Sequence, residues 1–162
     1  MKNKKYSEDG SVLLEALVVT SIFLIIILGL AGTLSFIVKA SLANVMKIQA
    51  SYLAEEGLEA VRLLRDASWA MNIAGEVSGV PFYLNFNGSS WVKTAVNTYV
   101  DETFERKTTF SDVYRDSSQN IVSSGGTLDP NIKKVTVAVY WNSYGATTTR
   151  SLSTYITNVF SN

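Results

Sequence analysis

The sequence predicts an α+β fold in which a long N-terminal α-helix packs against a C-terminal antiparallel β-sheet. Three observations support this prediction. Residues 12–38 are almost all apolar, and helical periodicity without proline then continues to Asp66. Near the other end, residues 135–141 alternate between large apolar side chains and others, as a strand with one buried face does. The first half of the helix is predicted to be transmembrane and the second half amphipathic.

The composition narrows the possible functions. The 162 residues suffice for one globular domain with an accessory segment. The 14 basic and 14 acidic residues balance, and they balance again beyond residue 66, so no charge excess indicates a nucleic-acid partner. The chain has no cysteine and no histidine, which removes disulfides, thiol nucleophiles and the commonest metal ligands. We therefore expect no enzymatic activity, no metal and no cofactor.

The chain begins with a short polar leader, residues 1–10, which contains Lys2, Lys4 and Lys5. The apolar stretch that follows exceeds the roughly 20 residues that a helix needs to cross a bilayer core. Lysines on the N-terminal side favour a cytoplasmic N-terminus, which places the rest of the chain outside. The sequence therefore predicts a single-pass protein of the inner or cytoplasmic membrane, with its C-terminal part extracytoplasmic.

Two other interpretations of this segment remain open. The first is a secretory signal peptide cut after the small-residue pattern Gly29-Leu30-Ala31, although the apolar region is long for such a peptide and contains a carboxylate. The second is a simple membrane anchor that is neither cut nor assembled into anything larger.

Glu15 is the informative residue of the apolar stretch. A carboxylate at mid-bilayer costs on the order of 3 kcal/mol, so it calls for a compensating partner. A position near the membrane surface, in the first helical turn, would instead be tolerated because the helix dipole favours a negative charge there. The position of Glu15 relative to Gly10 distinguishes these interpretations.

This part of the sequence resembles the type IV pilin and type II secretion pseudopilin family. The family pattern is a short basic leader ending in glycine, a cut after that glycine, and a glutamate at the fifth position of the mature chain. Here Gly10 precedes the cut, Ser11 becomes the new N-terminus and Glu15 falls on the fifth position. The resemblance extends to about Asp66, and residues 134–158 resemble the C-terminal ends of some minor pilins.

The resemblance implies a structural subunit of a type IV pilus or pseudopilus at the cell surface. It implies a prepilin peptidase, N-methylation of Ser11, an assembly platform with its ATPase, and other pilin or pseudopilin subunits as partners. The amine of Ser11 would pair with Glu15 of an adjacent subunit, or with its own, and so set the assembly register. The sequence departs from the family pattern in two ways. It has Ser11 where members often have phenylalanine, and it lacks the cysteines that form a C-terminal disulfide in many members.

Gly29 and Gly32 are the weakest points of the predicted helix, each costing about 1 kcal/mol relative to alanine. In the resembling family, many members carry a helix-kinking proline where Gly32 stands. One interpretation is a flexible segment that stretches when the subunit leaves the membrane. The other is ordinary small-residue packing between transmembrane helices.

Residues 39–70 are predicted to be the amphipathic half of a helix that runs from Val12 to near Asp66, about 80 Å at 1.5 Å per residue. One broad face is apolar, and it consists of Leu53, Ala54, Leu58, Val61 and Leu64. The opposite side is charged, with Glu59–Arg62 and Arg62–Asp66 at helix-neighbour spacings, and it also contains Glu55. Glu55, Glu56 and Glu59 suggest a metal site, but a solvated face explains them better because histidine is missing.

Residues 71–162 are predicted to form a β-rich globular head. Residues 80–86 form a strand candidate with Pro81 near its start, and Asn87-Gly88 predicts a hairpin returning through residues 91–92. Asn87-Gly88-Ser89 also matches a glycosylation acceptor. Residues 104–114 are a further strand candidate, and residues 123–130 are predicted to be a loop.

The clearest strands come last. Val135, Val137, Val139 and Trp141 form the predicted buried face, and a turn around residues 143–145 leads into a strand over 147–160. The aromatic residues here are expected to pack in the core or between subunits rather than to act as adhesive surface groups; they are Tyr140, Trp141 and Tyr155.

Two other functions compete with the structural one. The first is a single-pass, membrane-anchored binding or adhesion module that does not assemble, and an intact leader would support it. The second is an extracytoplasmic hydrolase that uses Asp101, Glu102 and Glu105, which form a charged cluster without a nucleophile motif.

Overall fold

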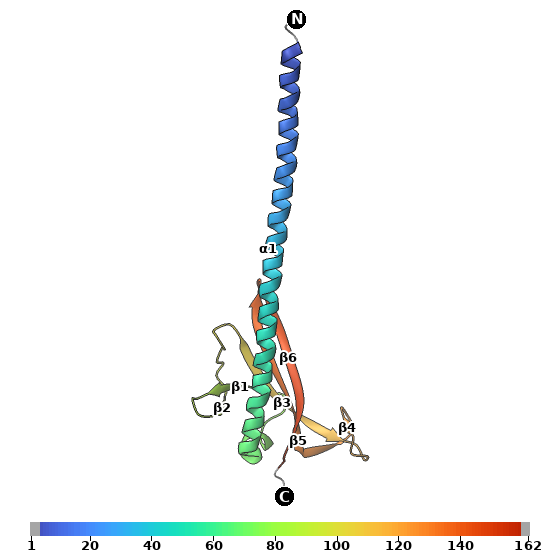
Figure 1. The fold of residues 1–162 in the computed structure, drawn as a ribbon. Helices are drawn as coiled ribbons and strands as arrows, with labels where there is room; N and C mark the ends of the chain where they lie inside the picture. The colour runs from blue at the N-terminus through green and yellow to red at the C-terminus, as the bar shows by residue number, and fades with distance from the viewer. Residues whose placement is uncertain (1–3, 160–162) are drawn as a thin grey trace. The chain divides into compact units, whose positions relative to one another are not determined.

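A computed structural model describes residues 4–159, with side chains from Gly10 onward. The described residues form helix α1 (Lys4–Ala67), the short π-helix η1 (Ala70–Ala74) and six strands (Figure 1). The strands are β1 (Pro81–Phe86), β2 (Trp91–Thr94), β3 (Glu105–Arg115), β4 (Ile121–Val122), β5 (Thr127–Ser143) and β6 (Ala146–Thr157). The chain divides into two compact units, Met1–Val45 and Met46–Asn162. In the second unit the helix packs against an antiparallel sheet, so the predicted α+β fold is confirmed.

Helix α1 ends where predicted but begins earlier. It contains no proline and ends at Ala67, one residue after the expected end. It begins at Lys4 rather than Val12, because extending a helix that has already nucleated adds a hydrogen bond for each residue fixed. At its C-terminal end, the Leu64 carbonyl accepts hydrogen bonds from the Ser68 amide (3.2 Å) and the Asn72 side-chain amide (2.8 Å). These bonds satisfy a carbonyl that the end of the helix would leave without a partner.

The sheet has the strand order β2-β1-β3-β5-β6, with β4 paired to β3, and all of these pairs are antiparallel. Both predicted hairpins are confirmed. The β1–β2 turn spans residues 87–90, with Gly88 at φ +94°, and the Asn87 side-chain oxygen accepts hydrogen bonds from the Ser89 and Ser90 amides. The β5–β6 turn is Tyr144-Gly145, and both residues have positive φ, as a tight hairpin turn requires.

The predicted loop over 123–130 is only half right. Residues 123–126 connect β4 to β5, but residues 127–130 already belong to β5. The pairing of β3 with β5 is irregular here: Asp112 pairs with Lys133, whereas Tyr114 pairs with Leu128. Pro130 lies in the bulged stretch of β5 between those partners, where it is not required to donate a hydrogen bond to β3. A strand can therefore contain a proline, although proline next to aspartate in a sequence favours a loop.

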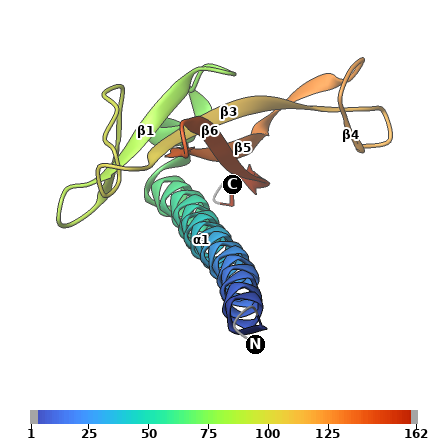
Figure 2. The same cartoon turned by 90° about the horizontal axis from the view of Figure 1, so that it is seen from above.

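The two faces of the sheet differ. The face toward the helix is apolar, and its buried side chains include Phe82, Leu84, Phe104, Phe110, Val135, Val137, Val139, Trp141 and Ile156. Figure 2 shows the strands lying to one side of the end of α1 that precedes them in the chain. The buried face predicted for residues 135–141 is thus confirmed. The strand predicted over 147–160 is β6, and Phe160 lies outside the described residues.

The three C-terminal aromatic residues occupy different environments. Trp141 is buried and lies 6.0 Å from Phe104 between ring centroids. Tyr140 is half-buried on the other face of the sheet, where the Lys107 ammonium lies 5.0 Å from its ring centroid. Tyr155 retains 49% of its surface exposed. Core packing is therefore confirmed for Trp141 but not for Tyr155, for which packing between subunits stays a prediction.

Candidate assembly helix

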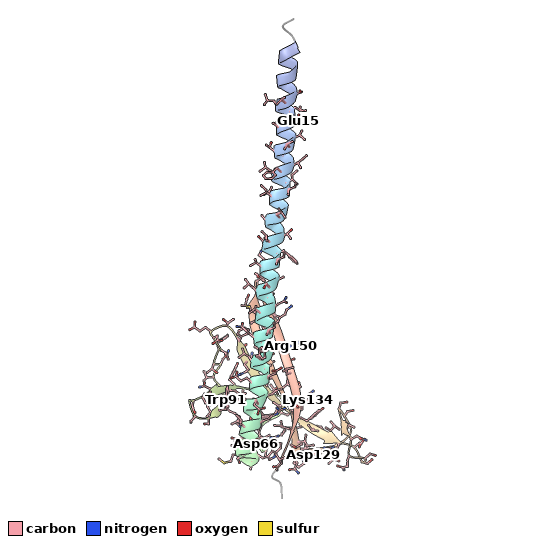
Figure 3. All side chains as sticks on the ribbon, in the orientation of Figure 1. Glu15, Asp66, Trp91, Asp129, Lys134 and Arg150 are labelled. Atoms are coloured by element: carbon pink, nitrogen blue, oxygen red, sulfur yellow. The ribbon has the colours of Figure 1, made fainter. Side chains whose placement is uncertain are left out.

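The first part of α1 exposes an apolar surface on every side. Each large apolar side chain between Val12 and Val38 is 45–73% exposed in the described chain. Among the described residues, one helix is long and apolar enough to span a membrane, and none of its most apolar stretch is buried. Figure 3 shows side chains projecting on both sides of this part of the helix. Such a surface requires lipid or other apolar partners.

The polar side chains within this segment hydrogen-bond to the helix itself. The Thr20 hydroxyl donates to the Ala16 carbonyl (2.8 Å), and the Ser21 hydroxyl donates to the Val18 carbonyl (2.8 Å). Thr33 and Ser35 make the same kind of bond, to carbonyls four residues earlier. Bonds of this kind leave no hydroxyl hydrogen unpaired in an apolar environment. Serine and threonine therefore do not interfere with burial of this segment.

Glu15 differs from these hydroxyl residues. It lies one helical turn after Ser11, so both residues are on the same side of α1, and Glu15 is exposed. Within the described residues, no ion pair involves its carboxylate. It is also the single charged residue between Ser11 and Val38. Burial of this segment would therefore leave one charge that needs an external partner.

The Gly10–Ser11 bond and the two glycines at 29 and 32 all lie inside α1. A Cβ atom built at Gly10, Gly29 or Gly32 meets no other atom within 4 Å, apart from the helix's own backbone. The helix continues through Gly29 and Gly32, and the Gly29 carbonyl accepts a hydrogen bond from Thr33 (2.9 Å). None of these glycines is required by close packing within the chain.

The second part of α1 is fixed to the sheet through small residues. Ala50, Ala54, Gly57 and Ala60 are buried against it, together with Val61 and Leu64. A Cβ atom at Gly57 would lie 2.8 Å from Val137 Cγ1, so only glycine permits this approach of helix and strand. The predicted apolar face is confirmed: Ala54, Val61 and Leu64 are buried, and Leu53 and Leu58 pack at its margin.

Arg106 on β3 forms the main polar contact between helix and sheet. It is 4% exposed, and its guanidinium donates hydrogen bonds to the Glu56 carboxylate (2.7 Å) and to the Leu53 carbonyl (3.3 Å). It also donates to the Leu84 carbonyl on β1 (3.4 Å) and lies 5.1 Å from the Trp91 ring centroid. One side chain thus joins the helix to two strands. The ion pair is costly to break from the helix side, because loss of the half-exposed Glu56 would leave the buried Arg106 guanidinium without its counter-charge.

The charged side of α1 is only partly as expected. Arg62 pairs with Glu59 at 2.9 Å, as predicted, but Asp66 pairs with its neighbour Arg65 at 2.8 Å instead of with Arg62. Glu56 forms an ion pair with Arg106 on β3. No group of three or more acidic residues within the described chain is arranged to hold a metal ion.

The carboxylates considered for hydrolysis occupy different environments. Asp101 and Glu102 are exposed, in a turn where both have positive φ. Glu105 lies on β3, where its carboxylate accepts hydrogen bonds from Tyr83 (3.0 Å) and Asn97 (2.9 Å) and pairs with Lys107 (3.0 Å). Desolvation, followed by the bond to Glu105, raises the pKa of Tyr83. The bond to Glu105 raises the pKa of Lys107. The described contacts therefore place Glu105 in a structural network.

Sequence reasoning missed Gly57 and Arg106 as contacts between helix and sheet. Gly57 lies inside a predicted helix, and Ala50, Ala54 and Ala60 fall on the same helix face. A face made of such small residues indicates that another element approaches the helix backbone closely. Arg106 gave a weaker signal, because both faces of β3 carry polar residues and alternation does not identify the inner one.

Comparison of the chain with family models, with curated proteins and with solved structures gives no match.

Proposed function

We propose that this chain is a structural subunit of a type IV pilus or a related pseudopilus. It would be cut after Gly10, methylated on Ser11, and assembled through the apolar part of α1. Support comes from the order of features along the chain: a basic leader, Gly10, Glu15, and then apolar residues on all sides of one continuous helix.

Glu15 carries the proposal. Its carboxylate is the single charge in the apolar segment and has no ion pair among the described residues. Cleavage after Gly10 would create an amine four residues earlier, on the same side of the helix. When apolar helices gather side by side, that amine and the carboxylate of a neighbouring copy neutralise one another, and their pairing selects one register.

The remaining elements of the proposal follow from this assembly. The precursor is held in the inner or cytoplasmic membrane by α1, with residues beyond 38 outside, and the assembled subunit is extracytoplasmic at the cell surface. Its partners are a prepilin peptidase, an assembly platform with its ATPase, and other pilin or pseudopilin subunits. The helix-and-sheet unit, residues 46–162, provides a folded head with no disulfide.

Mass spectrometry of the N-terminus of native material tests the proposal. The expected result is a mature chain that begins at Ser11 and carries one added methyl group on its amine. The matched control is Gly10→Val, because a branched side chain at the cut position should leave residues 1–10 attached.

An unmodified chain that still carries residues 1–10 would contradict the proposal and support a membrane-anchored binding module. A chain that begins at Gly32 would contradict it in favour of a secreted protein.

A further inference from the structure

The globular unit carries a basic groove beside α1. The groove has a volume of about 410 Å³ and is lined by Lys47, Ile48, Ser51, Trp141 and residues 148–150. Arg150 Nε donates a hydrogen bond to the Ser51 hydroxyl (3.2 Å), which holds the guanidinium against the helix. Lys47 and Arg150 are the charged residues of this lining, so its formal charge is +2. Among the described residues, neither has a carboxylate partner in an ion pair.

An acidic surface follows further along the same helix. Three glutamates and one arginine line it, which gives a formal charge of −2, and the complete lining is Tyr52, Glu55, Glu56, Leu58, Glu59 and Arg62. Glu56 pairs with Arg106 and Glu59 pairs with Arg62. Glu55 is exposed and has no ion pair within the described part of the chain. The two surfaces are therefore opposite in sign, and within the described part of the chain Glu55 is the one carboxylate of the acidic lining without an ion pair.

The two surfaces lie at different heights and on different sides of α1. Glu55 follows Lys47 by eight residues, which is about 12 Å along the axis and about 80° around it, at 1.5 Å and 100° per residue. The acidic surface of one copy can therefore meet the basic groove of another if the two helices are parallel, displaced by about 12 Å along the axis and rotated by about 100° relative to one another. A contact between two different surfaces is head-to-tail, and it can be repeated without limit when it does not close into a ring.

We propose that the acidic surface around Glu55 binds the Lys47–Arg150 groove of the next copy of this chain. The proposal rests on the proposed filament function and adds a second charge register in the globular unit. A second copy is the partner that fits, because the chain as a whole is neutral and carries both surfaces. Opposite charges of this kind select the register of a contact more than they add affinity.

Disulfide trapping tests the proposal, and the chain suits it because it contains no cysteine. An Ile48→Cys, Leu58→Cys double variant places one thiol in each lining and keeps Lys47, Arg150 and Glu55. Within one chain its two Cα atoms are about 15 Å apart, beyond the roughly 7 Å that a disulfide spans. Any disulfide must therefore join two copies. After mild oxidation of assembled full-length material, a non-reducing gel should show a ladder of dimers, trimers and longer species. The matched control is Ile48→Cys with Ser118→Cys, which keeps the same charges and places the second thiol in an exposed turn that is not part of the acidic lining. It should give at least about tenfold less material above the dimer, since disulfides form only at close approach.

The N-terminus and the sedimentation of the same samples separate the two proposals. Filaments of cut subunits that give no ladder, or that give dimers alone, would overturn the head-to-tail contact and leave the proposed function standing. Uncut, monomeric material would overturn both.

Discussion

At the scale of single residues, Glu15 and Asp129 show how the energetic effect of a carboxylate depends on the groups around it. Glu15 is placed in an apolar segment where the described chain offers it no counter-charge. Asp129 lies on β5, where Arg115 Nε donates a hydrogen bond to its carboxylate (2.7 Å) and the Asn131 amide donates another (3.0 Å). If its segment is buried, the first carboxylate would need a partner beyond the described residues, whereas the second is satisfied within the fold.

Replacing Glu15 by leucine should leave membrane insertion and cleavage intact but prevent incorporation into filaments. Loss of one partner of a buried pair costs about 3–5 kcal/mol, which is roughly a hundredfold or more in an association constant. The measurement is the amount of the variant in sheared filaments relative to the membrane fraction. Thr20→Val is the control, because the Thr20 hydroxyl already bonds within its own helix and its loss should change little. Wild-type incorporation of Glu15→Leu would refute the role given to this residue.

The hydrogen bonds of Asp129 predict how the stability of the globular unit depends on pH. The Arg115 hydrogen bond lowers the pKa of Asp129 below its ordinary value of 3.8. A carboxyl group whose pKa is lower in the folded state stabilises the fold above its unfolded pKa, and this contribution is lost as pH falls through the folded pKa. Asp129→Asn should therefore be less stable than the wild type near pH 7, and the difference should shrink below about pH 4.

Chemical denaturation between pH 7 and pH 2, followed by tryptophan fluorescence, measures this effect. Asp101→Asn is the matched control, because Asp101 is exposed and has no ion pair among the described residues. A stability difference between wild type and Asp129→Asn that stays constant across the whole range would contradict the prediction.

At the scale of elements, the contact between α1 and the sheet depends on how closely the helix backbone approaches β5. Ala50, Ala54 and Gly57 present almost no side-chain bulk, so Val137 reaches the helix backbone. Arg106 then adds hydrogen bonds to the helix and to β1 beside the same point. The position of the helix is therefore set by shape and by one buried cation together.

Gly57→Val should lower the free energy of unfolding by about 1–3 kcal/mol, because its side chain would overlap Val137 and the Arg106 methylenes. Denaturation of the full chain in detergent, followed through the buried Trp69 and Trp141, measures the change. Gly75→Val adds the same side chain where no atom lies within 4 Å, so it should change stability by no more than about 0.5 kcal/mol. Equal stabilities for the two variants would show that helix and sheet are not in close contact at Gly57.

At the scale of the whole molecule, the fold class and most of the elements could be predicted from the sequence. Hydrophobic periodicity located α1, β1, β3, β5 and β6, and turn residues located both hairpins. The loop predicted at Pro130 was wrong, because a β-bulge accommodates a proline that a regular ladder of strand hydrogen bonds excludes. The inward-facing Arg106 and Lys133 were not foreseen, because their burial depends on partners distant in the sequence, namely Glu56 and Asp112. Gly10, Ser11 and Glu15 were singled out because they resemble the pattern of the pilin and pseudopilin family, and their roles in cleavage and assembly remain predictions.

The missing side chain at Gly57 has a mechanical consequence for the globular unit. If residues 46–67 turned about their own axis, a neighbouring residue with a real side chain would move into the space above Val137. The guanidinium of Arg106 would at the same time lose its alignment with the Leu53 carbonyl. Torque applied to residues 46–67 is therefore transmitted to strands β3 and β5, so that this stretch of helix and the sheet turn together.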